Sequence, residues 1–228
     1  MVLTAALALV AGTAQAQVYP PPENVLQLNA SGTVEAPQDL LIVTLAATRE
    51  GPDAASVQAP LKAVLDAALA EAKRAAQPGQ LEVRSGNFTV LPRHDRDGRI
   101  RAWQGTAELV LEGRDFARIG QLAGRMPGMS VAGMAFALSR EQRQQVEVEA
   151  QQQAIARYRT KAQELARSFG FNGYSLREVS VQTHEQGPGP RPRMLAMEAK
   201  SAAADLALPA EAGKTAVVVT VSGSVQLR

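Results

Sequence analysis

Residues 139–170 read SREQRQQVEVEAQQQAIARYRTKAQELARSFG and predict one long helix on which the rest of the chain is organised. Ser139 is a favourable N-cap residue, and Gln142, three positions later, completes the pattern of a capping box. Gly170 follows the last periodic residue and suits the left-handed conformation that ends many helices. At 1.5 Å per residue the helix would be about 45 Å long, so it needs a broad sheet to pack against.

Apolar residues recur at steps of three or four along this helix and predict one buried stripe. The stripe consists of Val146, Ala150, Ala154, Tyr158, Ala162, Leu165 and Phe169. Because most of these side chains are small, the helix can approach its partner closely. The opposite face is polar, and its glutamine-rich part, residues 144–153, is consistent with either a solvent-exposed surface or a contact between copies of the chain.

Strand-like patterns lie on both sides of the helix. Strands are expected at 25–36, 40–50, 81–92, 100–111, 129–138, 175–183 and 215–227, and shorter helices at 53–76 and 115–125. The order ββαββαβαββ predicts an α+β fold. Antiparallel or mixed sheets would pack against the long alanine-rich helix and two shorter helices.

Five local features add detail to this prediction. The short link 36–39 predicts an antiparallel hairpin between the first two strands, and Gly32 is expected to form a bulge. The apolar start of the second strand, LLIV, indicates burial on both faces. Pro60 predicts a late start or a kink in the first helix. Asp97-Gly98 marks the turn of a hairpin between 81–92 and 100–111.

Three segments lie outside the predicted helices and strands: residues 1–16, 17–24 and 185–213. Residues 1–16 resemble a signal peptide without its basic start, with an apolar run and an Ala14-Gln15-Ala16 cleavage site; the alternative is a frayed N-terminus. Residues 17–24 form a proline-rich leader, and 25–228 the domain. Within it, residues 185–213 are expected to be a mobile loop with a partner contact. No later segment is predicted to cross a membrane.

Composition and motifs exclude several classes of function. The chain has no cysteine, which rules out disulfides and thiolate chemistry, and its formal charge is only +2. His94 and His184 lie in predicted loops without converging ligands, and no nucleophile elbow or phosphate-binding loop occurs. We therefore predict no catalytic, cofactor-binding or metal-binding residues.

Arginines gather around the 81–111 hairpin. They are Arg84, Arg93, Arg96, Arg99 and Arg101. They are consistent either with a solvated hairpin face or with a basic patch for a phosphate, a lipopolysaccharide or an acidic partner. Nucleic acid is disfavoured as a partner, because an exported protein would be separated from the nucleic acid of the cell and because few aromatic residues are available for stacking on bases.

Several short segments, in a fixed order, resemble the SIMPL-domain family of bacterial exported proteins. They are Gly86 to Pro92, Trp103-Gln104-Gly105, Gly113 to Phe116, Met134 to Ser139, and the alanine-rich helix before Gly170. The resemblance implies a periplasmic or envelope-associated protein, with outer-membrane association as one form. It also implies large ring-like homo-oligomers, a link to stress tolerance, and no established catalytic residues.

Three functional hypotheses follow. The first is a non-enzymatic periplasmic protein that self-assembles. The second is a module that binds an anionic envelope component, or a partner protein, through the arginines of residues 84–101. The third is a hydrolase with an unrecognised site, which would require His94 or His184 in a cleft beside a serine or an aspartate.

Overall fold

The computed structural model describes residues 23–186 and 211–228, which form seven strands and three helices. In chain order they are β1 Val25–Pro37, β2 Leu40–Gly51, α1 Ala54–Ala75, β3 Glu82–His94, β4 Ile100–Gly113, α2 Phe116–Gly124, β5 Ser130–Ala137, α3 Arg140–Ser168, β6 Tyr174–Gln186 and β7 Lys214–Leu227. This is the predicted α+β order. The signal peptide, most of the leader and most of the 185–213 loop lie outside the described residues, although Glu185 and Gln186 belong to β6.

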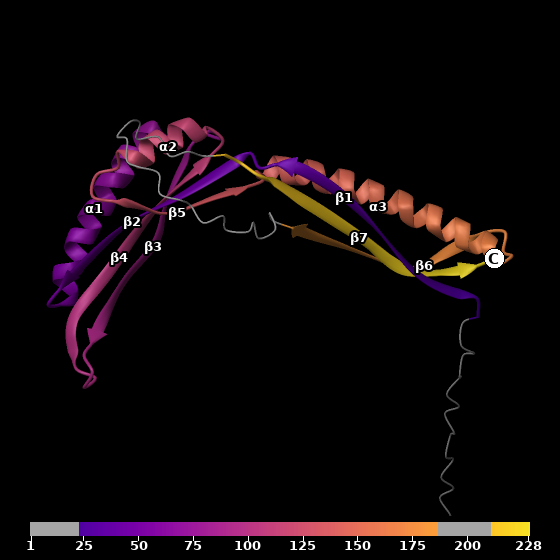
Figure 1. Ribbon diagram of the computed structural model, residues 1–228, viewed down its shortest axis with the longest axis horizontal. Helices are drawn as coiled ribbons and strands as arrows, with labels where there is room; N and C mark the ends of the chain where they lie inside the picture. The colour runs from indigo at the N-terminus through magenta and orange to yellow at the C-terminus, as the bar shows by residue number, and fades with distance from the viewer. Residues whose placement is uncertain (1–22, 187–210) are drawn as a thin grey trace, which may run out of the picture.

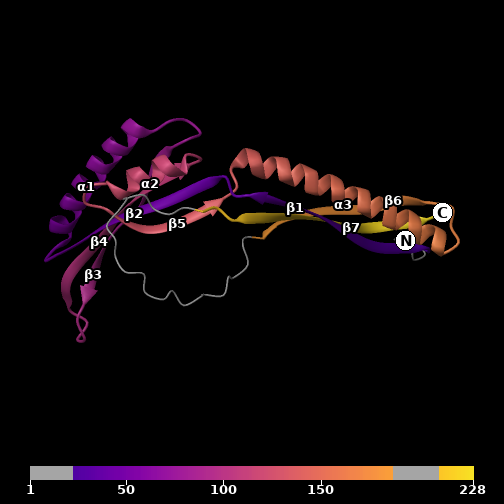
Figure 2. The same ribbon diagram turned by 45° about the horizontal axis from the view of Figure 1, so that its top comes forward.

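The elements form two lobes, each built on an antiparallel sheet. The four-stranded lobe has the strand order β3-β4-β2-β5 and carries α1 and α2, and the three-stranded lobe has the order β1-β7-β6 and carries α3. Figure 1 shows the lobes along the long axis of the molecule, with all three helices on one side, and Figure 2 agrees. The other face of each sheet is therefore without a helix in the described residues.

The predicted hairpin between the first two strands is wrong. β1 pairs with β7, whereas β2 lies between β4 and β5 in the other sheet. None of the residues Ala36–Asp39 has the positive φ that a tight hairpin turn requires. Instead the backbone N–H of Gln38 donates to the carbonyl of Gly213, at 2.9 Å, and the chain crosses from one lobe to the other.

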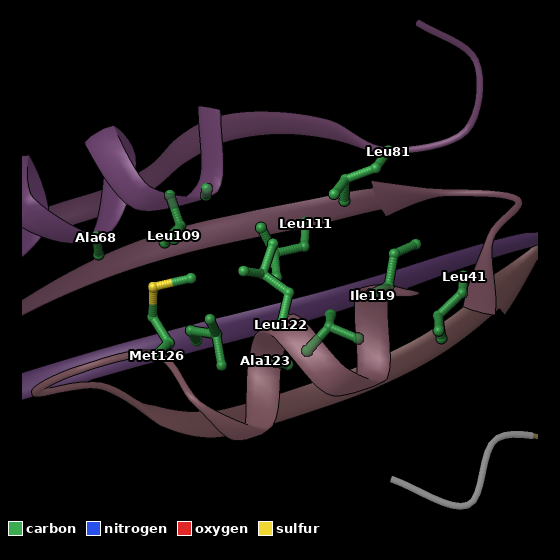
Figure 3. Close-up of a cluster of buried hydrophobic side chains, with 12 residues drawn as sticks. Leu41, Ala68, Leu81, Leu109, Leu111, Ile119, Leu122, Ala123 and Met126 are labelled. Carbon is green, nitrogen blue, oxygen red and sulfur yellow. The ribbon is translucent and has the colours of Figure 1, made fainter. Parts of the chain in front are cut away.

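Leucine side chains fill the core of the four-stranded lobe. They lie between the sheet and helices α1 and α2, together with Ile119, Ala123 and Met126 (Figure 3). On β2, one face is buried and the other is half-buried, so the predicted burial on both faces is only partly right. The difference arises because both helices cover the same face of this sheet.

In the core of the three-stranded lobe, alanines supply most of the buried face of α3, and valines and leucines supply the sheet side. The predicted stripe on α3 is buried from Val146 to Ala162, but its last member is Ala166. Leu165 is only partly buried, and Phe169 is 61% exposed. The stripe keeps a step of four residues to its end, so Phe169 falls outside it and Phe171 packs there instead.

Gly32 makes the close approach of α3 to the sheet possible. A Cβ atom at this position would lie 2.1 Å from the carbonyl oxygen of Ala150. The β1–β7 register runs without a shift through Gly32, so the predicted bulge is wrong. Only a residue without a side chain fits beneath the helix here.

The helix starts and the hairpin turn largely follow the sequence signals. Asp53 caps α1 in a capping box with Ser56, and Asp115 caps α2. Helix α1 begins at Ala54 and continues through Pro60, so the late start is wrong, and the alternative, a kink at Pro60, stays a prediction. Gly98 has a φ of +78° in the β3–β4 turn, as the Asp-Gly signal predicted. In residues 23–186 and 211–228, no helix is both long and apolar enough to cross a membrane.

Candidate functional surfaces

The five predicted arginines divide into two groups on the β3–β4 hairpin. Arg84 lies near the start of β3, with an Nη2 atom 3.9 Å from Oε2 of Glu112. Arg93 lies near the end of β3, with an Nη1 atom 4.0 Å from Oε2 of Glu50. Arg96, Arg99 and Arg101 lie at the tip, where no ion pair within the described part of the chain involves them. The structure thus separates Arg84 and Arg93, each near a glutamate, from the three arginines of the tip.

The tip is held in one conformation by Asp95. Its Oδ1 atom accepts hydrogen bonds from the backbone N–H groups of Asp97 and Arg99, both at 2.9 Å. The backbone N–H of Asp95 also donates to the carbonyl of Arg99, at 2.9 Å. The carboxylate keeps its negative charge, so segment 93–101 has four arginines against two aspartates.

The hairpin also projects beyond the rest of its sheet. The pairing between β2 and β4 ends at Gly51 and Trp103, and the remainder of β4 pairs only with β3. In Figure 1 the tip lies at the end of the four-stranded lobe that faces away from the three-stranded lobe. Ile100 is 54% exposed there, between Arg99 and Arg101. The tip therefore combines cationic and apolar side chains.

The two histidines lie in different lobes. His94 is exposed at the end of β3 in one lobe, and His184 is exposed on β6 in the other. Among the described residues, no group of three His, Asp or Glu side chains could hold a metal ion. The hydrolase hypothesis required a histidine in a cleft, and neither position provides one.

Two of the four sheet edges are blocked against further pairing. Along β1, Arg157 and Lys161 of α3 donate to the carbonyl groups of Ser31 and Asn29, at 2.7 and 3.0 Å. Along β3, a proline at position 92 and exposed arginines interrupt the edge. Such features are typical of edges that do not associate with another strand.

Within residues 23–186 and 211–228, the other two edges, β5 and β6, pair with no further strand and contain no proline, although each has one register shift, at Ala132 and at Arg177. Strand β5 has the sequence SVAGMAFA, with no charged residue and no proline, and Val131 and Met134 are exposed on it. On β6, the exposed apolar residues are Leu176, Val179 and Val181. We call these two strands the open edges. An exposed apolar edge strand has unpaired backbone groups and is a site at which another strand can add.

The position of α3 explains why β6 stays uncovered. The helix packs mainly on β1 and β7. Its contacts with β6 include the Glu147 carboxylate, which accepts a 2.9 Å hydrogen bond from the hydroxyl of Thr183, and the pair Arg143–Glu185 at 3.1 Å. Both contacts lie at the end of β6 nearest the other lobe, so they leave the stretch from Leu176 to Val181 exposed.

A polar cluster joins the two crossings between the lobes. Asp39 lies on the crossing from β1 to β2, and Ser139 on the crossing from β5 to α3. The Asp39 carboxylate accepts hydrogen bonds from the backbone N–H and the hydroxyl of Ser139, at 2.6 and 2.7 Å. Arg114 donates to the Ser139 hydroxyl at 2.7 Å and pairs with Asp39 at 3.3 Å and with Glu141 at 2.6 Å. We call these four residues the junction cluster.

The junction cluster changes both the cap of α3 and the ionisation of Asp39. The Ser139 hydroxyl caps the helix by accepting a hydrogen bond from the backbone N–H of Gln142, at 3.3 Å. In a capping box the Gln142 side chain would accept from the backbone N–H of Ser139, but here that N–H donates to the Asp39 carboxylate. Burial raises the pKa of Asp39, but the hydrogen bonds from Ser139 and the charge of Arg114 outweigh it and hold the pKa below its ordinary value. The ionised carboxylate is therefore the form that holds the crossings together.

Sequence reasoning missed the open edges and the junction cluster. The lack of charge in β5 was visible in the sequence, but its significance depends on the strand order. Asp39 and Ser139 are 100 residues apart, and no local pattern connects them. The only available signal was Ser139 as a helix cap.

Comparison with known families supports the resemblance seen in the short segments. The model of the family described as "SIMPL: Protein of unknown function (DUF541)" matches residues 26–225, which is nearly all of the described chain. A search of curated proteins returned no match to this chain.

Proposed function

This chain belongs to the SIMPL family, and from that membership we propose that it is a non-enzymatic, exported envelope protein that works as an assembly of several copies. Within this proposal the protein resides in the periplasm, or at the outer membrane, and supports the stress tolerance of the cell. Residues 1–16, read as a signal peptide, support export.

The pair of open edges is the observation that carries the assembly proposal. Each copy has one edge in each lobe, β5 and β6, and each edge exposes both backbone hydrogen-bonding groups and apolar side chains. Pairing with a second copy would satisfy the backbone groups and bury Val131, Met134, Leu176, Val179 and Val181. Full burial of one such side chain stabilises by about 1.5–3 kcal/mol, so a few of them matter for association.

Two edges per copy also favour assemblies larger than a dimer. If β5 of one copy pairs with β6 of the next, the contact is heterologous, and repeated contacts close into a ring or extend into a fibre. If each edge pairs with its own kind, copies still connect on both sides. In both arrangements one blocked edge remains in each lobe, which limits the directions of growth.

The test of assembly is the solution mass of the chain from Gln17 onward, measured by light scattering after gel filtration. We expect a discrete oligomer for the natural sequence. Lysines on the open edges, Met134→Lys with Val179→Lys, should shift the mass toward one copy, because they place charge in the contact. The matched control is Thr33→Lys with Ser85→Lys, which adds the same charge to the blocked edges and should leave the mass unchanged.

Two outcomes would contradict the proposal. A monomeric natural chain would remove assembly, and an equal loss of mass in the control variant would place the contact elsewhere. Export is tested separately by cell fractionation of the untagged protein in its own host. A cytosolic location would contradict the envelope role whatever the mass.

A further inference from the structure

The tip of the β3–β4 hairpin has a surface that the assembly proposal does not use. We propose that this tip, residues 93–101, docks on a membrane surface that contains anionic phospholipid. The inference concerns a single copy of the chain and does not depend on the open edges. It assigns a role to three of the predicted arginines, Arg96, Arg99 and Arg101.

The charge of the tip complements an anionic surface. The segment has four arginines against two aspartates, and the Asp95 carboxylate accepts two hydrogen bonds from the backbone. Arg93 lies near the Glu50 carboxylate, with 4.0 Å between its Nη1 atom and Oε2 of Glu50, so its charge is partly offset. The remaining three arginines lie within six consecutive residues, 96–101, in the turn and at the start of β4. A basic residue close to an anionic membrane surface contributes about 1 kcal/mol to binding. Because the arginines of the segment outnumber its aspartates by two, a net attraction remains.

Exposed apolar side chains distinguish a lipid surface from a soluble anion. Ile100 is 54% exposed between two of these arginines, and Leu91 is 63% exposed three residues before His94. A soluble phosphate would gain nothing from Ile100. At a bilayer surface, the same side chain can enter the boundary between headgroups and acyl chains while the neighbouring arginines contact phosphates.

The shape and rigidity of the tip fit this mode of binding. It extends past the last β2–β4 pair, Gly51 with Trp103, so no other strand of the sheet lies beside it. The Asp95 hydrogen bonds and the left-handed Gly98 fix the turn in advance. A surface that is already ordered loses little conformational entropy on binding.

The experiment measures co-sedimentation of the chain from Gln17 with two kinds of vesicle. One is phosphatidylcholine alone, and the other is phosphatidylcholine with phosphatidylglycerol. We expect binding to the anionic vesicles only, and weaker binding as salt rises, because exposed charges are screened. Equal binding to both vesicles, or no binding to either, would overturn the proposal.

Variants locate the binding surface. Arg96→Gln, Arg99→Gln and Arg101→Gln together should weaken binding to the anionic vesicles by about 100-fold. The control with the same loss of charge is Arg74→Gln, Arg84→Gln and Arg125→Gln, three exposed arginines outside the tip, which should change binding by only a few-fold. Equal losses in the two triple variants would overturn the assignment to the tip.

Ile100→Ser separates a lipid surface from a soluble anion. It should weaken vesicle binding by several-fold, because it removes apolar contact while every charge stays in place. Soluble glycerol phosphate, at a concentration matched to the lipid headgroups, should compete poorly. Unchanged vesicle binding by Ile100→Ser, together with full competition by glycerol phosphate, would show a simple anion site and overturn the proposal. Circular dichroism confirms that each variant is folded.

Discussion

The two lobes cover their sheets by different means. In the four-stranded lobe, fully buried strand leucines pack against Ile119 and Leu122 of α2 and against Ala68 and Ala72 of α1. In the three-stranded lobe, one long helix uses alanines and lies against β1 at Gly32. The first arrangement buries more apolar area per residue, whereas the second brings backbones closer together.

The difference has a consequence for the edges. Helix α3, which packs through alanines, lies close against β1 and β7 and contacts β6 little. The exposed apolar side chains of β6 therefore have no partner in the described chain. In the other lobe, α2 leaves Val131 and Met134 of β5 exposed. Each lobe thus ends in an open edge, although the two cores are built from different residues.

The largest expected effect comes from truncating the leucine core. Leu109→Ala removes a fully buried side chain and should lower the free energy of unfolding of the four-stranded lobe by about 3 kcal/mol. Trp103 is the only tryptophan and lies in this lobe, so its fluorescence reports the lobe during denaturant unfolding. If the lobes are separate units, fluorescence changes before the helical circular dichroism is fully lost. Coincident transitions would show that they unfold as one.

Gly32→Ala should destabilise the three-stranded lobe, so that it unfolds before the four-stranded lobe. The added Cβ cannot fit beneath Ala150, so α3 must move away from β1, and we expect a loss of about 2 kcal/mol. Helical circular dichroism should then fall at a lower denaturant concentration than the Trp103 signal. The control is Gly133→Ala on β5, where no atom lies within 4 Å of the added carbon. A similar loss in both variants would contradict the close approach as the cause.

Asp39→Asn should weaken the connection between the lobes by about 1 kcal/mol, a figure reduced because the site is partly exposed to solvent. The pKa of Asp39 is lower in the folded chain than its ordinary value of 3.8. The stabilisation by its charge is therefore present above pH 3.8 and is lost as the pH falls through the folded pKa. Unfolding measured from pH 7 downward should show the natural chain and the variant converging in this acidic range. A constant difference would indicate a role that does not depend on charge.

Tyr158→Phe should have the smallest effect. Among the described residues, the buried Tyr158 hydroxyl has no hydrogen-bond partner, so its removal should be neutral or stabilising by up to about 1 kcal/mol. Burial, and then the charge of Tyr174, raise the pKa of Tyr158 above its ordinary value of 10.0. The natural chain should therefore lose stability as the pH rises above 10, and the variant should lose less. A destabilised variant at pH 7 would indicate a missing partner for the hydroxyl.

Local signals in the sequence predicted the elements well. Ser139 and Gly170 marked the ends of the long helix, and Asp97-Gly98 marked the hairpin turn, because caps and turns depend on neighbouring residues only. The same reasoning failed between β1 and β2. A short link limits how far apart two strands can lie, but the sheet that each strand joins depends on β7 and β4, which are distant in the sequence.

The candidate surfaces were predictable in part. The arginine cluster was visible in the sequence, but the separation of Arg84 and Arg93 from the three arginines of the tip required the positions of Glu112 and Glu50. The open edges required the strand order. The same residues would be unremarkable inside a sheet, so no pattern within β5 or β6 could identify them as edges.

Cysteine cross-linking tests most directly whether the open edges join copies of the chain. The natural chain has no cysteine, so Met134→Cys with Val179→Cys places thiols on β5 and β6 alone. A short bis-maleimide reagent should then give covalent oligomers on a denaturing gel, and the two single-cysteine chains would show which edges meet. Cysteines on the blocked edges, Thr33→Cys with Ser85→Cys, should give only single chains. Oligomers from the blocked edges, with none from the open edges, would contradict the proposed assembly.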